Sequence, residues 1–438
     1  MSFQDLGLDP RILLKLQELG FDKPTPIQTQ AIPFAMAGRD VMGLAQTGTG
    51  KTAAFGLPLL HRLSVDRVKP RPKHIHGLVL APTRELVKQI HDSLKPLSDN
   101  LPLKLQVVVG GVSVNAQINR LNRGGADLMI ATPGRLLDLI KQGALFLDEA
   151  SFLVLDEADQ MLDMGFIHDL RKIAELLPEK RQTMLFSATM PKLMAEISKS
   201  YLTNPERVQV SPPGKVADKI TQELHFVSQA SKMGLLMELL EGHKEDRTLV
   251  FSRTKHGAEK MKRQLENAGF AAGSIHGNKS QGQRDRALAG FKDGSIKVLI
   301  ATDVAARGID IPEVKYVYNY ELPNVPDNYV HRIGRTARAG ASGKAIAFCG
   351  SQEMGELKDI QKVMKMEIPV ASGRAWAPEE QTEKPKQGGG RRRGGGGGRP
   401  QGGKPRSGGK PSGGKPAGGG GRRRKPGGGK PSGAGRRK

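Results

Sequence analysis

The sequence predicts an α/β protein with two tandem domains, each built on a parallel sheet, followed by a disordered basic tail. A chain of 438 residues is too long for one ordinary hydrophobic core. Short apolar runs, each leading into a polar motif and then a helical stretch, recur in two blocks along the chain. The last part consists mainly of glycine, proline, lysine and arginine. We therefore predict a first domain at 1–208, a linker at 209–218, a second domain at 219–371 and the tail at 372–438.

The first domain opens with a predicted helix. Asp9 can cap this helix, Pro10 suits its first turn and Gly20 can end it. Its apolar stripe contains Ile12, Leu13, Leu16 and Leu19. Apolar runs followed by polar motifs then lie at 76–86, 127–137, 151–162 and 182–190.

Runs such as 152–155 are continuous, as expected of strands that are buried on both faces of a parallel sheet. Parallel sheets bind ligands just beyond the carboxyl ends of their strands, where the polar motifs fall here. Pro212, Pro213 and Gly214 mark the linker. The same pattern of runs then resumes at 247–255, 297–310 and 344–350, which predicts the second domain.

The tail carries most of the net charge of +24. Residues 384–438 contain 18 Lys or Arg and no acidic residue, which leaves +6 for the rest of the chain. "GGKP" recurs four times there, and such a segment buries too little apolar surface to fold. The charge predicts a nucleic-acid partner, with a merely solubilising tail as the alternative. No aromatic residue follows Trp376, so the contacts are expected at phosphates.

The remaining composition indicates a soluble protein of the cytoplasm. Cys349 is the single cysteine, which excludes an internal disulfide and fits a reducing compartment. No apolar run reaches the length needed to span a membrane, and we recognise no signal peptide at the N-terminus. His74 and His76 lack partners at spacings that suit zinc, so no zinc site is predicted.

A phosphate-binding loop is predicted at "AQTGTGKT", between an apolar run and a helical stretch. Its glycines let backbone N–H groups approach phosphates, its lysine reaches the β and γ phosphates, and its last hydroxyl can meet Mg²⁺. A glycine-rich turn without a ligand is the alternative. Phosphate-binding loops of this kind generally begin with glycine, whereas this chain has Ala45 at that position. The loop residues are Ala45, Gln46, Thr47, Gly48, Thr49, Gly50, Lys51 and Thr52.

"VLDEAD" supplies the carboxylates that such a nucleotide site needs. Asp156 can hold Mg²⁺ through water, and Glu157 can orient and deprotonate an attacking water. Alone, the pair would as often be a solvated surface feature. The phosphate loop upstream favours the catalytic interpretation.

"HRIGRTAR" places Arg332, Arg335 and Arg338 at a spacing of three, on one broad face of a predicted helix. A basic helix face often contacts only solvent or nucleic acid. The second domain has no phosphate loop, which favours arginines that reach across to the nucleotide of the first domain. An inserted arginine can accelerate phosphoryl transfer about 10³- to 10⁵-fold.

The order of these motifs resembles the DEAD-box ATP-dependent RNA helicases of superfamily two, over residues 2–370. The resemblance implies RecA-like domains. "HRIGRTARAG" and the basic tail resemble the bacterial RhlE type in particular, and Ala337 stands where most members have glycine. In the family's Q motif, which "GFDKPTPIQ" resembles, Gln28 would bond adenine. Phe3 or Phe21 would pack against the base, with core packing as the alternative.

The resemblance implies further roles. The "SAT" hydroxyls would couple nucleotide state to unwinding by bonding Asp159 or His331, and Gly308 and Asp310 would face the nucleotide. The coupling residues would be Asp159, Ser187, Thr189, His331 and Arg332. RNA would meet Pro82, Thr83, Arg84, Gly110, Gly111, Thr132, Pro133, Gly134, Arg135, Arg253, Thr254 and Gly277, although each turn alone could be structural. Thr302, Asp303 and Arg307 would face RNA or bridge the domains.

We therefore expect an ATP-dependent RNA helicase that uses ATP and Mg²⁺ and unwinds or remodels RNA locally, with little sequence preference. Ribosomal particles and RNA-decay proteins are candidate partners, a membrane is not, and the protein is expected to be a monomer. Ribosome assembly, RNA decay and cold adaptation fit equally well. Two alternatives are an RNA clamp without hydrolysis and a double-stranded-DNA motor of the same superfamily.

Overall fold

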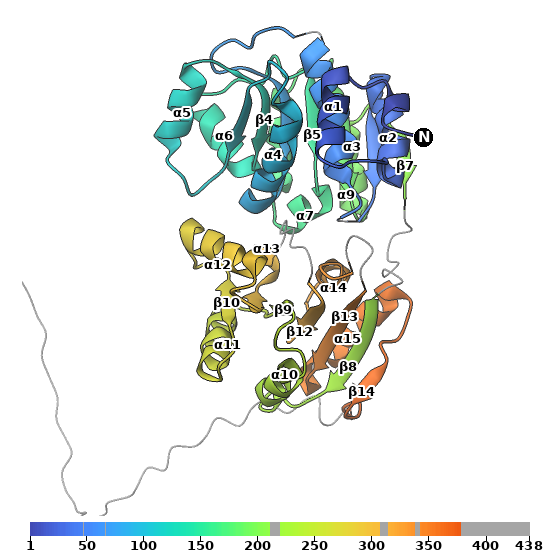
Figure 1. Ribbon diagram of the computed structural model, residues 1–438, viewed down its shortest axis with the longest axis vertical. Helices are drawn as coiled ribbons and strands as arrows, with labels where there is room; N and C mark the ends of the chain where they lie inside the picture. Colours follow the sequence, from blue (N-terminus) through green and yellow to red (C-terminus); the bar gives the residue numbers. More distant parts are fainter. Residues whose placement is uncertain (47, 66, 211–219, 307–313, 338–341, 378–438) are drawn as a thin grey trace, which may run out of the picture. The chain divides into compact units, whose positions relative to one another are not determined.

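The computed structural model describes residues 1–46, 48–65, 67–210, 220–306, 314–337 and 342–377. These residues contain two seven-stranded sheets in which every strand pair is parallel, with helices beside them (Figure 1). The predicted fold class, two tandem RecA-like α/β domains, is confirmed. By its internal contacts the chain divides into Met1–Glu383 and Lys384–Lys438. None of the described helices is long and apolar enough to cross a membrane.

The first lobe contains the sheet of order β3-β4-β2-β5-β6-β1-β7. Its strands are β1 (Val41–Leu44), β2 (Ile75–Leu80), β3 (Leu105–Val108), β4 (Ala126–Ala131), β5 (Phe152–Leu155), β6 (Gln182–Ser187) and β7 (Glu206–Gln209). Its helices are η1 (Gln4–Leu6), α1 (Pro10–Glu18), α2 (Pro26–Met36), α3 (Lys51–Val65), α4 (Arg84–Ser98), α5 (Val114–Asn122), α6 (Pro133–Lys141), α7 (Ala158–Asp163), α8 (Ile167–Leu176) and α9 (Lys192–Tyr201).

Both faces of this sheet are buried, which explains the continuous apolar runs. In β2, Val79 belongs to a core cluster with residues of α1 to α4, whereas Leu78 and Leu80 belong to a second cluster with residues of α6 to α9. The predicted first helix is present as α1, and the Asp9 side chain accepts a hydrogen bond from the Arg11 N–H. The helix ends before Leu19, which is exposed instead of belonging to the stripe.

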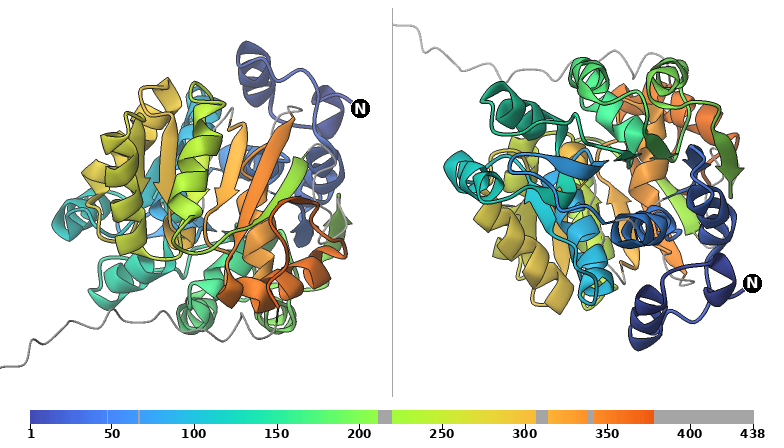
Figure 2. Two further views of the ribbon diagram at one scale, coloured as in Figure 1. Left: turned by 90° about the horizontal axis from the view of Figure 1, so that it is seen from below. Right: turned by 90° about the horizontal axis from the view of Figure 1, so that it is seen from above.

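The second lobe contains the sheet of order β10-β11-β9-β12-β13-β8-β14. Its strands are β8 (Ile220–Phe226), β9 (Thr248–Phe251), β10 (Ala272–Ile275), β11 (Val298–Ala301), β12 (Tyr316–Asn319), β13 (Gly343–Cys349) and β14 (Val370–Ser372). Its helices are α10 (Lys232–Glu241), α11 (Lys255–Asn267), α12 (Gln281–Asp293), α13 (Asp303–Ala306), α14 (Pro326–Ile333), η2 (Ser351–Glu353) and α15 (Met354–Met364). Figure 2 shows α10 and α11 over one face of this sheet, where they share a core cluster with β9 and β11.

The two sheets have the same strand order when each is numbered from its own first strand. β8 thus occupies the place of β1. The helix that follows β1 begins at Lys51, and the helix that follows β8 begins at Lys232. Each lobe therefore has a lysine at the start of the helix that follows its first strand.

The domain boundaries differ slightly from those predicted. Gln209, the first residue of the predicted linker, is the last residue of β7, and most of the linker lies outside the described residues. At the other end, Ser372 belongs to β14 and its Oγ lies 2.7 Å from His225 Nδ1. Trp376 Nε1 donates to the Cys349 carbonyl at 3.1 Å. The second lobe therefore continues beyond 371, and the rest of the predicted tail lies outside the described residues.

Candidate functional site

The phosphate loop joins β1 to α3 at the carboxyl end of the first sheet. Gly48 and Gly50 have φ of 82° and 91°, in the left-handed region that favours glycine. Lys51 is only 6% exposed, and its Nζ donates to the Ala45 carbonyl at 3.0 Å. The positive end of the α3 dipole adds to the lysine charge, so the loop is suited to bind an anion. Thr47 lies outside the described residues.

Gln28 supports this loop from α2. Its side-chain oxygen accepts from the Thr25 N–H at 2.9 Å, and its Nε2 donates to the Gly50 carbonyl at 3.0 Å. The Thr25 hydroxyl donates to the Thr49 carbonyl at 2.8 Å. A Cβ on Gly50 would lie 2.5 Å from Gln28 Nε2, so glycine is required there. Both polar groups of the Gln28 amide thus contact protein, and its adenine contact remains a prediction.

The two phenylalanines predicted to meet the base differ in burial. Phe3 is 3% exposed and belongs to the core cluster that also contains Leu6 and Ile12. This agrees with the alternative of core packing. Phe21 is 44% exposed, which makes it the candidate that remains available to a base.

Asp156 and Glu157 follow β5 and are both almost completely buried, at 2% and 3% exposure. Burial raises the pKa of Asp156 to about 7, against the lowering effect of the Lys51 charge, and the neighbouring Glu157 charge raises it further. The Glu157 N–H donates to Asp156 Oδ1 at 3.0 Å. Glu157 has a φ of 51°, so its backbone is held in a conformation that costs a non-glycine residue about 1 kcal/mol or more.

One oxygen of this carboxylate pair has no partner. Glu157 Oε2 is buried without a hydrogen bond among the described residues. Thr52, the second residue of α3, adds a half-buried hydroxyl. A buried carboxylate with a raised pKa and a second carboxylate with an unpaired oxygen are compensated well by a cation. The residues therefore fit Mg²⁺.

Asp159 joins this site to the "SAT" segment after β6. Its Oδ2 accepts from the Thr189 hydroxyl and the Thr189 N–H, both at 2.9 Å, and its own N–H donates to Ser187 Oγ at 3.3 Å. Of the two partners expected for these hydroxyls, Asp159 is thus the one contacted.

The arginines of the second lobe are arranged differently from the prediction. α14 ends at Ile333 and Gly334 forms its C-cap, so Arg335 lies in the turn after the helix. The three arginines therefore do not share one helical face, and this prediction was wrong. Arg335 is 6% exposed. Arg338 lies outside the described residues, as do Arg307, Gly308 and Asp310.

The Arg332 guanidinium forms its hydrogen bonds and its ion pair inside its own lobe. It pairs with both oxygens of Asp303 at 2.5 and 2.7 Å, and its Nη1 donates to Asn319 Oδ1 at 3.0 Å and to the Glu321 carbonyl at 2.7 Å. Its guanidinium also lies 4.9 Å from the centre of the Phe251 ring. Arg332 thus connects the ends of β11 and β12. His331, its neighbour in the sequence, is half-buried.

Most residues predicted to face RNA line one cavity of about 790 Å³. They are Pro82, Thr83, Arg84, Gly110, Gly111, Thr132, Gly134, Arg135 and Gly277. Pro133, Arg253, Thr254, Thr302 and Asp303 do not line it. Sequence reasoning missed Asp138, Met164, Phe166 and Val304, which also line it. Of these, only Val304 lies among residues predicted to face RNA, between Asp303 and Arg307.

Arg84 is one of the cations that line this cavity. A Cβ on Gly111 would lie 1.8 Å from Arg84 Nη1, so glycine at 111 gives the guanidinium its room. Arg84 Nη1 also donates to Gln281 Oε1 at 3.3 Å, and Arg284 pairs with Glu85 at 2.9 Å. Thr83 caps α4, where its hydroxyl accepts from the Leu86 N–H, and Thr254 caps α11 in the same way. Such helix starts present free N–H groups to phosphates.

The chain matches two protein families. Residues 25–197 match the DEAD/DEAH box helicases, and residues 231–340 match the helicase conserved C-terminal domain. The ATP-dependent RNA helicase CshA of Listeria monocytogenes is 41% identical over 375 residues, which are 86% of this chain and 71% of that protein.

Solved structures agree with these matches. Dbp5 of S. cerevisiae, bound to RNA and ADP BeF3, superimposes with a TM-score of 0.76 at 33% identity, over 85% of this chain and 95% of that chain. Mss116p bound to single-stranded RNA and AMP-PNP superimposes with a TM-score of 0.77 at 26% identity, over 88% of this chain and 83% of that chain. The family predicted from the motifs is thereby confirmed, whereas the RhlE type remains a prediction because the curated relative is a CshA protein. This chain belongs to the DEAD-box ATP-dependent RNA helicases.

Proposed function

We propose that this helicase binds ATP on the loop from Ala45 to Thr52, beside the carboxylates of Asp156 and Glu157. The observation that supports this assignment is the buried Asp156–Glu157 pair, with one Glu157 oxygen that lacks a partner among the described residues. Two buried acids beside a buried lysine are costly unless a ligand completes the site. A nucleotide with its metal would complete it.

Thr52 and Asp156 are proposed to hold Mg²⁺, Asp156 partly through water. When bound, the metal would neutralise charge on the β and γ phosphates. Lys51 would exchange its bond to the Ala45 carbonyl for phosphate oxygens. Its ammonium already lies at the loop.

Glu157 is proposed to orient the attacking water and to accept its proton. Asp156 Oδ1 accepts from the Glu157 N–H, whereas Glu157 Oε2 has no partner among the described residues, so the two carboxylates would serve different partners. Arg335 and Arg338 would neutralise the charge that develops on the γ phosphate. Such arginines can contribute about 10³- to 10⁵-fold in rate.

RNA binding and hydrolysis are proposed to be coupled through Asp159, Ser187 and Thr189 of the first lobe and His331 and Arg332 of the second. The residues around the 790 Å³ cavity, with Arg253, Thr254, Thr302, Asp303 and Arg307, are proposed to contact the RNA backbone. Backbone contacts carry little sequence information, so weak sequence preference is expected. Gly308 and Asp310 are proposed to face the nucleotide, with Asp310 at the ribose.

We also propose which type of DEAD-box helicase this is and what its tail binds. "HRIGRTARAG" and the tail support an RhlE-type member, and the 18 basic residues of 384–438 support a tether to structured RNA such as ribosomal particles. We propose that it acts as a monomer in the cytoplasm. Ribosome assembly, RNA decay and cold adaptation are all processes that such a tether would serve.

The deciding experiment is steady-state ATP hydrolysis by the full chain without nucleic acid, with single-stranded RNA and with DNA of the same sequence, beside Arg335→Ala. RNA is expected to stimulate hydrolysis strongly and DNA to do so weakly. The Arg335→Ala change should lower the RNA-stimulated rate by about 10³-fold or more. Equal stimulation by DNA would support the DNA motor instead, and no hydrolysis under any condition would support the clamp.

A further inference from the structure

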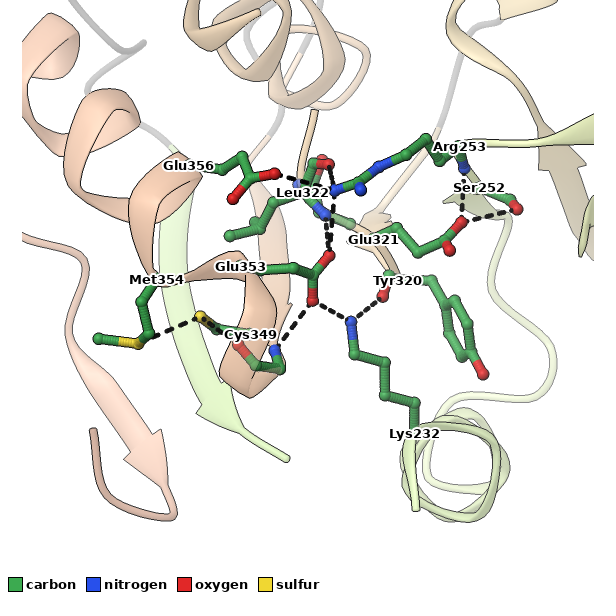
Figure 3. Close-up of polar contacts among 12 residues, drawn as sticks. Lys232, Ser252, Arg253, Tyr320, Glu321, Leu322, Cys349, Glu353, Met354 and Glu356 are labelled. Atoms are coloured by element: carbon green, nitrogen blue, oxygen red, sulfur yellow. Dashed lines mark hydrogen bonds and ion pairs between the residues drawn. The ribbon is translucent and has the colours of Figure 1, made fainter. Parts of the chain in front are cut away.

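A buried ion pair lies at the carboxyl end of the second sheet, outside the motifs (Figure 3). The Lys232 side chain is 0% exposed, and its ammonium pairs with Glu353 Oε2. Lys232 Nζ also donates to the Tyr320 carbonyl at 2.8 Å. A buried pair of this kind costs desolvation of both charges, so a role beyond stability is worth seeking.

The Glu353 carboxylate connects three neighbouring strands. Its Oε2 accepts from the Gly350 N–H at 2.9 Å, after β13. Its Oε1 accepts from the Leu322 N–H at 3.0 Å, after β12, and from Arg253 Nη2 at 3.5 Å, after β9. The strands β9, β12 and β13 are adjacent in the sheet, so one carboxylate fixes three consecutive strand ends.

Arg253 is held on this carboxylate from several sides. Its Nη2 donates to the Leu322 carbonyl at 2.9 Å and pairs with Glu356 at 3.5 Å, while its backbone N–H donates to Glu321 Oε2 at 2.6 Å. The side chain is 34% exposed. Within the described part of the chain, all its side-chain bonds use Nη2, so Nε and Nη1 stay available to a ligand.

The Glu353 charge is shared between two cations, Lys232 and Arg253. Glu353 alone would cancel the guanidinium charge, but Lys232 already neutralises Glu353 from the buried side. Lys232, Arg253 and Glu353 sum to +1, and Glu356 and Glu321, which also contact Arg253, bring the whole cluster to −1. A guanidinium whose geometry is set in advance loses less conformational freedom when it binds, which raises affinity.

We infer that Glu353, neutralised by Lys232, is a positioning residue that holds the Arg253 guanidinium ready for an RNA phosphate. The inference rests on the proposed RNA contact of Arg253. It adds two residues, Lys232 and Glu353, that belong to none of the motifs and act on RNA affinity only through Arg253.

The test measures the RNA concentration that half-saturates ATP hydrolysis by the full chain, using single-stranded RNA. Glu353→Gln alone would leave the Lys232 ammonium buried without a counter-ion, so the informative variant is Lys232→Met with Glu353→Gln. Arg253→Ala should raise the half-saturating concentration about tenfold, as expected for one charged hydrogen-bonded contact. The paired variant should raise it about three- to tenfold and retain the rate at saturating RNA. Glu356→Gln, which removes a more exposed partner of the same Nη2, is the matched control and should change it less than about twofold.

The combination of Arg253→Ala with the paired variant decides the inference. If Glu353 acts through Arg253, the combined variant should bind RNA no more weakly than Arg253→Ala alone. The inference would be overturned if the combined variant weakened RNA binding by the product of the two separate effects. It would also be overturned if the paired variant bound RNA with unchanged affinity. It would also be overturned if Arg253→Ala left RNA affinity unchanged. That result would be distinguishable from failure of the proposed function, because stimulation of the unmodified chain by RNA is measured in the same experiment.

Discussion

Replacing Gly50 with alanine is expected to lower kcat/KM for ATP by about 10²- to 10³-fold. Gly50 has a φ of 91°, where a side chain costs about 1–2 kcal/mol. The new Cβ would lie 2.5 Å from Gln28 Nε2 and 3.0 Å from Thr25 Oγ1, so both side chains must move. Losing their bonds to the loop carbonyls costs about 1 kcal/mol each. Together these terms disfavour the loop conformation by about 3–4 kcal/mol.

The measurement is kcat/KM for ATP at saturating RNA, with the thermal melting temperature followed in parallel. Gly143→Ala is the matched control. Gly143 has a φ of 63° and nothing within 4 Å of an added Cβ, so this change adds the backbone strain without the collision. The control should lose stability but keep kcat/KM. If Gly50→Ala kept kcat/KM within about threefold of the parent chain, the proposed support of the loop by Gln28 and Thr25 would be refuted.

Three further outcomes are expected. Because the pKa of Asp156 is raised to about 7 by burial, the folded protein without ligand binds a proton that the unfolded chain releases near the ordinary value of 3.8. Its stability should therefore fall as pH rises from about 4 to 7, by up to about 1.4 kcal/mol per pH unit. Asp156→Asn should flatten this fall in urea unfolding at pH 5 and pH 8 and abolish hydrolysis; an unchanged slope would contradict the assignment. Ala337→Gly should relieve strain at a φ of 55° and change the free energy of unfolding by less than about 1 kcal/mol, since glycine also gains freedom in the unfolded chain. A loss above about 2 kcal/mol would show that the methyl group is needed. Deleting 384–438 should weaken RNA binding and lower its salt dependence, by about 0.7 in log–log slope for each phosphate contact removed. Retention of the full slope would exclude phosphate contacts by the tail.

Strand positions were predictable because both faces of each sheet are covered. Runs such as Phe152–Leu155 and Val298–Ala301 are apolar at every position, and they form β5 and β11 in the interior of their sheets. The motif at the end of each run follows from the same rule, since parallel strands direct their carboxyl ends to one edge. Most of the strands and the phosphate loop could therefore be predicted from local sequence patterns.

Long-range packing accounts for what the sequence did not show. Phe3 is covered by a core whose members come from many parts of the first lobe, so its burial has no local signal. The spacing of the arginines continues the helical pattern through Gly334, although α14 ends one residue earlier. Glu353 lies 100 residues after Arg253 and in no motif, and only the strand order brings the two together.

The shared strand order of the two sheets bears on how many nucleotides one chain can use. Lys51 and Lys232 occupy corresponding places, each opening the helix after the first strand of its lobe. In the first lobe the lysine ends on a loop carbonyl that a phosphate can replace. In the second lobe the chain supplies its own anion, Glu353, as a built-in counter-ion. Lys232 of the second lobe is thus already paired with a carboxylate of the same lobe. The expected stoichiometry is therefore one ATP per chain.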